Sequence, residues 1–389
     1  MNQETHRINE SFINEERAAA YYLQTVPGMK IRDIRALKNH FGSFVTALSA
    51  SEKDYPDLIS ADLIKELKDR LKTGSPFEAY ADLLRSDIHY CMEDDPAYPL
   101  PLMNIASPPF SLFYKGSLPD PDIPCVAVIG ARNCSGYGRQ MAREFSRELG
   151  LAGIQLISGL AAGVDSIAGS SSITVGGRSF AVLGSGIDIC YPSSSKALYD
   201  STPANGGLIS EYLPSTPAVG HHFPARNRII SGLADAVLVV EARKKSGTLI
   251  TVNMALEQGK DVYAIPGRIN ESLSYGCNML IRDGAVPALS PFEFVDELLH
   301  KIKKCPASFK SSLKDGDINR NNNCDDMFLS SDERIVMSAL DCNPRSISEI
   351  FLDLPEDSGI SLPGLMTLLT NMVMHHKIKC LDSSNYYLE

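Results

Sequence analysis

The chain has 389 residues, 44% of them hydrophobic and 22% charged, which are the proportions of a globular protein with room for two or three domains. No apolar run approaches the roughly 20 residues of a membrane span, and the polar N-terminus lacks the apolar core of a signal peptide. The nine cysteines are scattered without a C-x-x-C pair, so we expect reduced thiols in the cytoplasm, without a disulfide framework or a metal site.

The formal net charge of −10 argues against a nucleic-acid partner, but the charge is unevenly distributed along the chain. Residues 1–125 hold 13 Lys and Arg against 19 Asp and Glu, and residues 291–389 hold 10 against 16. Residues 126–290 hold 14 against 12 and are therefore slightly basic. Because the field at the site decides whether a polyanion binds, a basic cleft in this central segment is compatible with the acidic chain.

The first domain, residues 1–90, is predicted to be helical. Within it TVPGMKIRDIRALKNHFGS, at 25–43, places apolar residues at helical spacing after a Pro-Gly turn. This pattern is typical of a small helix-hairpin module, which either contacts DNA backbones or serves as an accessory packing domain. The proline-rich stretch at 96–124 predicts an extended connection into the next domain.

The central domain, residues 91–305, alternates short apolar runs with amphipathic stretches. Continuous apolar runs are typical of strands buried on both faces of a sheet, and they occur at 126–130, 154–159, 179–184, 207–211, 236–242 and 261–267. Amphipathic stretches such as 138–150 and 247–259 end in glycine, as helices often do. The alternation predicts an α/β fold with a doubly wound parallel sheet, whose ligands bind beyond the carboxyl ends of the strands.

The C-terminal part of the chain is predicted to be a linker followed by a small domain. Residues 306–330 are polar and poor in apolar side chains, which indicates a flexible linker. Residues 331–389 follow the order helix, helix, helix and hairpin, which is that of a winged-helix domain. Because this domain is acidic, contact with a protein partner suits it at least as well as contact with DNA.

The most informative candidate site is HFPARNRIISG at 222–232. It places Arg226 and Arg228 on either side of Asn227, ahead of an apolar run with helical spacing. Two guanidiniums and an amide provide neither a nucleophile nor an obvious general base, but they suit planar, bidentate contacts with phosphate oxygens and base edges. We therefore expect a polyanion-binding surface, with the two arginines facing the cleft beyond the strand ends.

Further basic or small residues lie near the expected strand ends and helix starts. Arg132 follows the first strand, Arg178 precedes the third, and Lys196 lies near a helix start, so each suits a phosphate or forms an ordinary surface contact. The loop Ser246–Thr248 opens a helix, where backbone N–H groups either hold an anion or are simply capped. Together with the arginine pair, these residues are expected to form one anion track.

The same loops argue against two other functions, the binding of a dinucleotide cofactor and acid catalysis. The turn at 130–139 has Arg132 where a dinucleotide fingerprint needs its second glycine, and the second strand ends in Ser158-Gly159, without the acidic residue that holds a ribose. No nicotinamide cofactor is therefore expected. Asp165 is interpreted as a structural cap rather than a catalytic acid, and Gly159 and Gly163 as points of close approach.

In this order, the segments GAR…SGYG, SGLA-x-GVD, GGR-x-FAVLGSGID-x-x-YP, FPARNRIISGLAD, VVEA…SGTLIT and AIPG…GCN-x-LIRDGA resemble the DNA-processing protein A family, also called DprA or Smf. The resemblance is specific over residues 95–300 or so and extends more loosely to both ends of the chain. It implies an extended Rossmann-like domain, flanked by an N-terminal helical domain of SAM or helix-hairpin-helix type and a C-terminal winged-helix-like domain.

The resemblance further implies a cytoplasmic protein that is not an enzyme and needs no cofactor. Such proteins bind and protect single-stranded DNA during natural transformation and recombination, load the RecA recombinase onto it, and commonly form homodimers. By motif, the implied DNA-binding residues are, in chain order, Gly130, Arg132, Ser158, Gly159, Arg178, Lys196, Arg226, Asn227, Arg228, Ser246, Gly247 and Thr248.

Two alternatives stay open. A nucleotide phosphoribohydrolase of the lysine-decarboxylase-like family has a related fold, but its P-G-G-x-G-T loop with a following Glu is SGTLIT here, without the catalytic carboxylate. A transcription regulator acting through residues 331–389 is the other alternative, and the acidic character of that unit counts against it.

Overall fold

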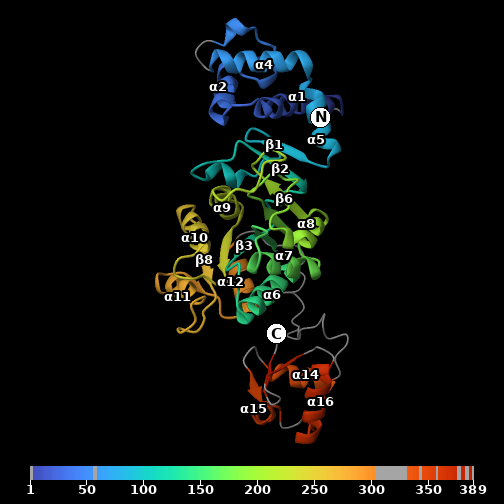
Figure 1. Cartoon of the computed structure of the whole chain (residues 1–389), viewed down its shortest axis with the longest axis vertical. Coiled ribbons are helices and arrows are strands. Elements are labelled where there is room, and N and C mark those ends of the chain that lie inside the picture. Colours follow the sequence, from blue (N-terminus) through green and yellow to red (C-terminus); the bar gives the residue numbers. More distant parts are fainter. Residues whose placement is uncertain are drawn as a thin grey trace. The chain divides into compact units, whose positions relative to one another are not determined.

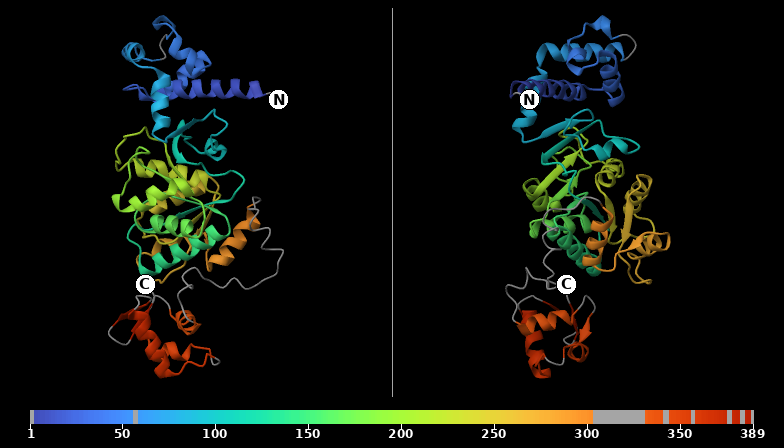
Figure 2. Two further views of the ribbon diagram at one scale, coloured as in Figure 1. Left: turned by 90° about the vertical axis from the view of Figure 1, so that its right-hand side faces the viewer. Right: turned by 180° about the vertical axis from the view of Figure 1, so that it is seen from behind.

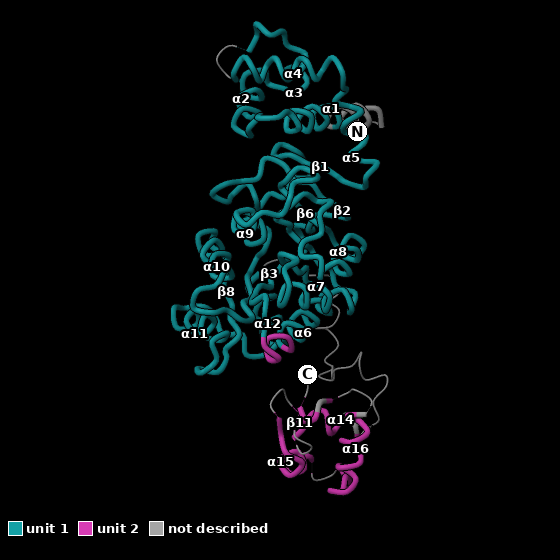
Figure 3. The backbone as a smooth tube through the Cα atoms, in the orientation of Figure 1, with its two compact units in different colours: residues 1–134, 141–309 teal, residues 135–140, 310–389 magenta. Residues whose placement is uncertain are grey.

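A computed structural model describes residues 3–55, 59–302, 331–340, 344–355, 358–374, 378–381 and 385–387. The chain divides into two compact units, residues 1–134 with 141–309 and residues 135–140 with 310–389 (Figure 3). The predicted linker at 306–330 lies outside the described residues. The domain limits expected at residues 90 and 305 stay predictions.

The N-terminal part of the first unit is helical, as predicted. Its helices are α1 (Gln3–Thr25), α2 (Ile31–Phe41), α3 (Phe44–Ser49), α4 (Ala61–Thr73) and α5 (Pro76–Arg85) (Figure 1). The Pro-Gly turn follows α1, and Gly28 has a φ of +83° there, a conformation that residues with a Cβ rarely adopt. Ser43 and Ser60 cap α3 and α4, because each hydroxyl accepts a hydrogen bond from a backbone N–H in the first turn.

The centre of the first unit is a sheet with nine strands among the described residues, in the order β1-β2-β6-β5-β4-β3-β7-β8-β9. The strands are β1 (His89–Met92), β2 (Ser111–Gly116), β3 (Cys125–Ile129), β4 (Gln155–Ser158), β5 (Ser179–Val182), β6 (Gly206–Ser210), β7 (Ala236–Val239), β8 (Asp261–Ala264) and β9 (Val286–Pro287). From β6 to β9, neighbouring strands run parallel. The predicted strands are β3 to β8, so the expectation of a parallel α/β core is confirmed.

The sheet is not parallel throughout, because β1 and β2 extend it as an antiparallel pair beside β6. The expected extended connection at 96–124 is therefore only partly right: it contains β2, which forms ladders on both sides. Leu112 and Phe113 explain why this short segment pairs. Both are fully buried, and they enter hydrophobic clusters on opposite faces of the sheet.

Helices cover both faces of the sheet (Figures 1 and 2). One face packs against α9 (His222–Leu233), α10 (Gly247–Glu257) and α11 (Tyr275–Arg282), and the other against α6 (Gly136–Leu151), α7 (Val164–Thr174) and α12 (Pro291–Lys301). Along β3, Ala127 and Ile129 point into the first layer, and Val126 and Val128 into the second, as the alternation of a strand requires. No helix in the described part of the chain is long and apolar enough to cross a membrane.

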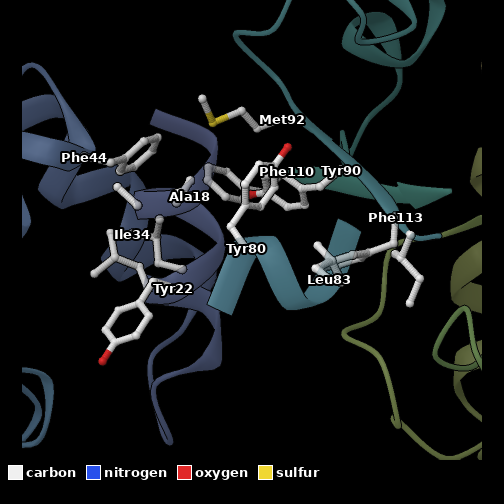
Figure 4. Packing of buried hydrophobic residues seen from close by; sticks show 14 of the residues in the cluster. Ala18, Tyr22, Ile34, Phe44, Tyr80, Leu83, Tyr90, Met92, Phe110 and Phe113 are labelled. Carbon is white, nitrogen blue, oxygen red and sulfur yellow. The ribbon is translucent and has the colours of Figure 1, made fainter. Parts of the chain in front are cut away.

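The N-terminal helices share a hydrophobic core with the antiparallel edge of the sheet (Figure 4). Tyr80 of α5 packs edge-on against Tyr90 of β1, and Phe113 of β2 lies next to Tyr90, with ring centroids 5.3 Å apart. Polar contacts reinforce this packing, because Arg17 of α1 forms a salt bridge with Asp95. The N-terminal helices and the antiparallel edge of the sheet are therefore parts of one continuous hydrophobic core.

The C-terminal part of the second unit contains three helices and a three-stranded sheet among the described residues of 331–387. The elements are α14 (Ser331–Ser338), β10 (Arg345–Ser346), α15 (Ile347–Leu352), α16 (Leu362–Met374), β11 (Lys379–Leu381) and β12 (Asn385–Tyr387). The strands are antiparallel, in the order β10-β12-β11, and Leu365, Leu369 and Met372 of α16 pack into a core with Val336. The helices and the final hairpin lie where the sequence predicts them, whereas assignment to the winged-helix class stays a prediction.

Candidate functional site

Loops from three strands meet at the carboxyl edge of the parallel sheet. The Thr248 hydroxyl, at the start of α10, donates a hydrogen bond to the Gly130 carbonyl at the end of β3, with an oxygen–oxygen distance of 3.1 Å. The backbone N–H of Val164, after β4, donates to the Ala131 carbonyl at 3.2 Å. Gly163 must be small here, because a Cβ on it would lie 2.2 Å from the Arg132 carbonyl oxygen. The loops after β3 and β4 are thus packed backbone against backbone, and the loop after β7 joins them through the Thr248 side chain.

Arg132 is an exposed cation at this edge. Its guanidinium carbon lies 5.6 Å from the ring centroid of Phe223, in the first turn of α9. Among the residues that the structure describes, no carboxylate lies within ion-pair distance of Arg132. The alternative of an ordinary surface salt bridge therefore finds no support in the described contacts, and this guanidinium keeps donors available for a ligand.

The first turn of α10 is joined to the loop that carries Arg132 by the hydrogen bond between Thr248 and Gly130. The Ser246 hydroxyl caps the helix by accepting from the Thr248 N–H at 3.2 Å. Gly247 is exposed, and a Cβ on it would meet no heavy atom within 4 Å, so its backbone is open to a ligand. The exposed Lys244 and Lys245 precede the cap and add positive charge. Charge and helix dipole both favour an anion here.

Arg226 is not on the surface, which corrects the expectation that it faces the cleft. Only 4% of it is exposed. Its Nη1 donates to the Gly159 carbonyl at 2.8 Å and to the Val182 carbonyl, and its Nε donates to the Asn227 side chain. Burial lowers the pKa of Arg226 to about 10, a shift that the nearby Asp165 opposes. The guanidinium therefore links the carboxyl ends of β4 and β5 from inside the protein.

Arg228 is also engaged within the protein. Its Nη2 forms a 2.6 Å ion pair with Glu211, its Nε donates to the Ser107 carbonyl, and its Nη1 donates to the Ala225 carbonyl. Only 17% of its side chain is exposed. The two arginines flanking Asn227 are therefore framework residues in this structure, and the sequence expectation of two open guanidiniums is wrong about their placement.

Asp165 completes the framework beneath the loops. Its carboxylate accepts hydrogen bonds from the backbone N–H of Gly159, at 2.9 Å, and of Ala161. Burial raises the pKa of Asp165, while Arg226 and the two N–H groups oppose the rise. The peptide of Gly159 links the two buried charges, because its N–H binds Asp165 and its carbonyl binds Arg226. The interpretation of Asp165 as a structural residue agrees with these contacts.

Arg178 lies at the opposite edge of the sheet, so the expected single track does not include it. It precedes β5, and its guanidinium donates to the Ser117 hydroxyl at 2.8 Å. Together with Gly116 and Gly206 it lines a cavity of about 290 Å³ at the amino ends of the parallel strands. Lys196, by contrast, opens α8 (Lys196–Ser201) after β5, is exposed, and forms a salt bridge with Asp200.

The remaining predicted residues form the floor of the carboxyl edge. Ser158 is the last residue of β4 and is buried. Gly159 leaves no room for a side chain, because a Cβ on it would lie 2.1 Å from Nη2 of Arg226. Sequence reasoning missed the aromatic pair Tyr191 and Phe223 and the exposed Arg243. A signal was present, since Tyr191 and Phe223 lie inside motifs that were already singled out and Arg243 directly follows the VVEA motif.

The comparisons of this chain with known proteins agree on one family. A family model described as DNA recombination-mediator protein A matches residues 89–299. DNA processing protein DprA of Streptococcus pneumoniae is 42% identical over 206 residues, which are 51% of this chain and 73% of that protein. Protein Smf of Escherichia coli is 39% identical over 222 residues, which are 56% of this chain and 59% of that protein.

A solved structure of one of these relatives has a similar fold. The X-ray structure of DprA from Streptococcus pneumoniae superposes with a TM-score of 0.60 at 33% identity, covering 73% of this chain and 97% of that one. A structure of DNA processing protein A from Helicobacter pylori, which addresses the single-stranded DNA binding mode of that protein, gives a TM-score of 0.49 at 28% identity, covering 55% and 96%.

Proposed function

The chain belongs to the family of DNA recombination-mediator protein A, and from this premise we propose that it binds single-stranded DNA along the carboxyl edge of its parallel sheet. The observation that carries the proposal is the open guanidinium of Arg132, in the loop after β3 whose Gly130 carbonyl is hydrogen-bonded to Thr248 in the first turn of α10. Cations and helix N-termini that face solvent suit phosphates, which dominate the affinity of single-strand binding proteins.

Residues at this edge divide into ligand-binding and supporting groups. We assign phosphate contacts to Arg132, Lys196 and the loop Ser246–Thr248, because Arg132, Lys196 and Gly247 are exposed and the loop opens α10. In this proposal Gly130, Ser158 and Gly159 form the base of the binding surface, over which the DNA strand passes. Arg226, Asn227 and Arg228 support this base from inside, since their hydrogen bonds end on protein carbonyls and Glu211. Arg178 lies outside the site.

The arrangement of the residues at this edge favours DNA binding over catalysis of a reaction on the DNA. Asp165, the carboxylate beneath the loop after β4, is buried and already accepts two backbone N–H bonds, so it is poorly placed to act as a general base toward a ligand. We therefore propose that the chain is a binding protein and not an enzyme.

The wider biological role follows from the family. We propose that the chain protects single strands in the cytoplasm and loads the RecA recombinase onto them during natural transformation and recombination. We further propose that it acts as a homodimer and that residues 331–389 form a winged-helix-like domain, which the order and pairing of α14, α15, α16 and the hairpin support.

A titration across salt concentrations tests the DNA-binding proposal. Fluorescence anisotropy with a labelled oligothymidine and with a duplex of equal length is expected to give tighter binding to the single strand. Affinity for the single strand should fall with salt, and Arg132→Ala should reduce the slope of log K against log salt by about 0.7, the share of one phosphate contact.

Arg178→Ala is the matched control, because it removes the same charge from the opposite edge of the same sheet. Its affinity and salt slope should equal those of the wild type. Equal binding of wild type and Arg132→Ala, both folded by circular dichroism, would refute the assignment of this edge. Recombinase assembly on the oligonucleotide, followed with and without the chain, tests the loading proposal separately.

A further inference from the structure

Two aromatic side chains continue the row that begins with Arg132. Tyr191, in the segment after β5, and Phe223, in the first turn of α9, have ring centroids 5.3 Å apart at an interplanar angle of 36°. The guanidinium carbon of Arg132 lies 5.6 Å from the same Phe223 ring. Cation and aromatic rings therefore form one contiguous surface, built from the segments after β3 and β5 and the start of α9.

The inner ring of this row is held firmly by the protein. Phe223 packs on the backbone at the end of β5, since a Cβ on Gly184 would lie 2.8 Å from its Cδ1 atom. Arg132 and Tyr191 flank Phe223. Little freedom is left to this ring, so it provides a fixed support for its neighbours.

The outer ring is accessible to a ligand. Tyr191 is 48% exposed, so about half of its ring and hydroxyl surface is open to solvent. An exposed aromatic face next to an unpaired guanidinium is the combination with which proteins hold unpaired nucleotides. The base stacks on the ring and the adjacent phosphate meets the cation.

We propose that Tyr191, supported by Phe223, forms a base-stacking subsite for single-stranded DNA, in which one base lies on the exposed face of Tyr191 while a neighbouring phosphate contacts Arg132. This inference rests on the proposed function and deepens it. It predicts a preference for single strands, because the bases of a duplex are stacked on one another and present no free face. It also predicts little sequence preference, since every base has a π face.

The test separates base contacts from phosphate contacts. Binding of the full chain is measured by anisotropy to a 20-nucleotide oligothymidine and to an oligonucleotide of the same length made of abasic sites with intact phosphates. Tyr191→Leu is expected to weaken binding of the oligothymidine roughly 5- to 150-fold, as the loss of one base–aromatic stack does, and to leave binding of the abasic strand unchanged.

A spectroscopic signal gives a second, independent measurement. A single 2-aminopurine in the oligothymidine is quenched when it stacks, so its fluorescence should fall on binding to the wild type and to Tyr191→Phe, which keeps the ring. Quenching should be lost with Tyr191→Leu. Phe77→Leu is the matched control, because it removes an exposed aromatic ring from α5, remote in the fold from this edge.

The outcomes distinguish the inference from the proposed function. If the wild type binds oligothymidine but Tyr191→Leu retains its affinity and quenching within twofold, the stacking subsite is refuted and DNA binding stands. If Tyr191→Leu weakens both strands equally, the residue acts on phosphates or on folding, and the inference is also wrong. If the wild type binds neither strand, the proposed function itself fails.

Discussion

Replacement of Arg226 by Met tests the finding that this arginine is a buried framework residue. The change keeps a long side chain but removes the donors that bind the carbonyls of Gly159 and Val182. Each buried carbonyl left without a partner costs about 1–3 kcal/mol, and Asp165 loses the cation that opposes its raised pKa. Since losing one member of a buried charged network costs about 3–5 kcal/mol, we expect destabilisation in that range.

The pH dependence of this loss has a defined sign. Burial holds the folded-state pKa of Asp165 above its ordinary value, and removal of Arg226 raises it further. A carboxyl group whose pKa is raised by folding destabilises the protein above that pKa and ceases to do so as it takes up a proton. The deficit of Arg226→Met relative to the wild type should therefore be largest at neutral pH and shrink as the pH falls through the folded-state pKa of Asp165.

Thermal unfolding followed by far-UV circular dichroism at pH 7 and pH 5 measures both effects. For a domain of this size, the expected loss corresponds to a melting temperature lower by roughly 6–20 °C. Arg132→Met, which removes an exposed arginine, should change stability by less than about 0.5 kcal/mol. Arg226→Met with Asp165→Asn should be more stable than Arg226→Met alone. An Arg226→Met variant that melts with the wild type would refute burial of this guanidinium.

Three further substitutions, one of them with a matched control, probe the packing of the first unit. Gly159→Ala should destabilise the chain by about 1–3 kcal/mol because its Cβ would clash with the buried guanidinium. Gly247→Ala is the control, and because open space surrounds it, its free energy of unfolding should stay within about 0.5 kcal/mol of the wild type. Equal melting temperatures for the two variants would contradict the packing around Gly159. Thr248→Val should cost about 1 kcal/mol by denaturant unfolding, through the lost bond to a carbonyl after β3. Asp95→Asn weakens the salt bridge with Arg17 and should cost about 2 kcal/mol, seen as faster proteolysis near α1; an unchanged digestion rate would count against that anchor.

The sequence predicted the parallel core because six strands there are continuous apolar runs bounded by small residues. It missed β1 and β2 as sheet strands because each is short and borders proline-rich sequence, which by itself favours an extended connection. Their pairing depends on tertiary contacts, with Leu112 and Phe113 packing on opposite faces.

For the site, residue type was predictable and exposure was not. Arg132 and Arg226 carry the same group, yet one is open and the other buried. The helical spacing held the missing information, because Arg226 shares a face with Ile229, Ile230 and Leu233, all of them buried. The place of Arg178 also followed from a simple rule, since a residue before a parallel strand lies at the edge opposite to residues that follow one.

The shared core of the N-terminal helices and the antiparallel strands has a practical consequence. Strand β1 is an edge strand of the sheet, and α1 and α5 cover the aromatic side chains beside it. Cutting the chain after residue 88 would uncover Tyr90 and Phe113 next to an unpaired strand edge, which is a template for aggregation. The contribution of this region to DNA binding is therefore better measured with surface charge substitutions on the intact chain than with a truncated protein.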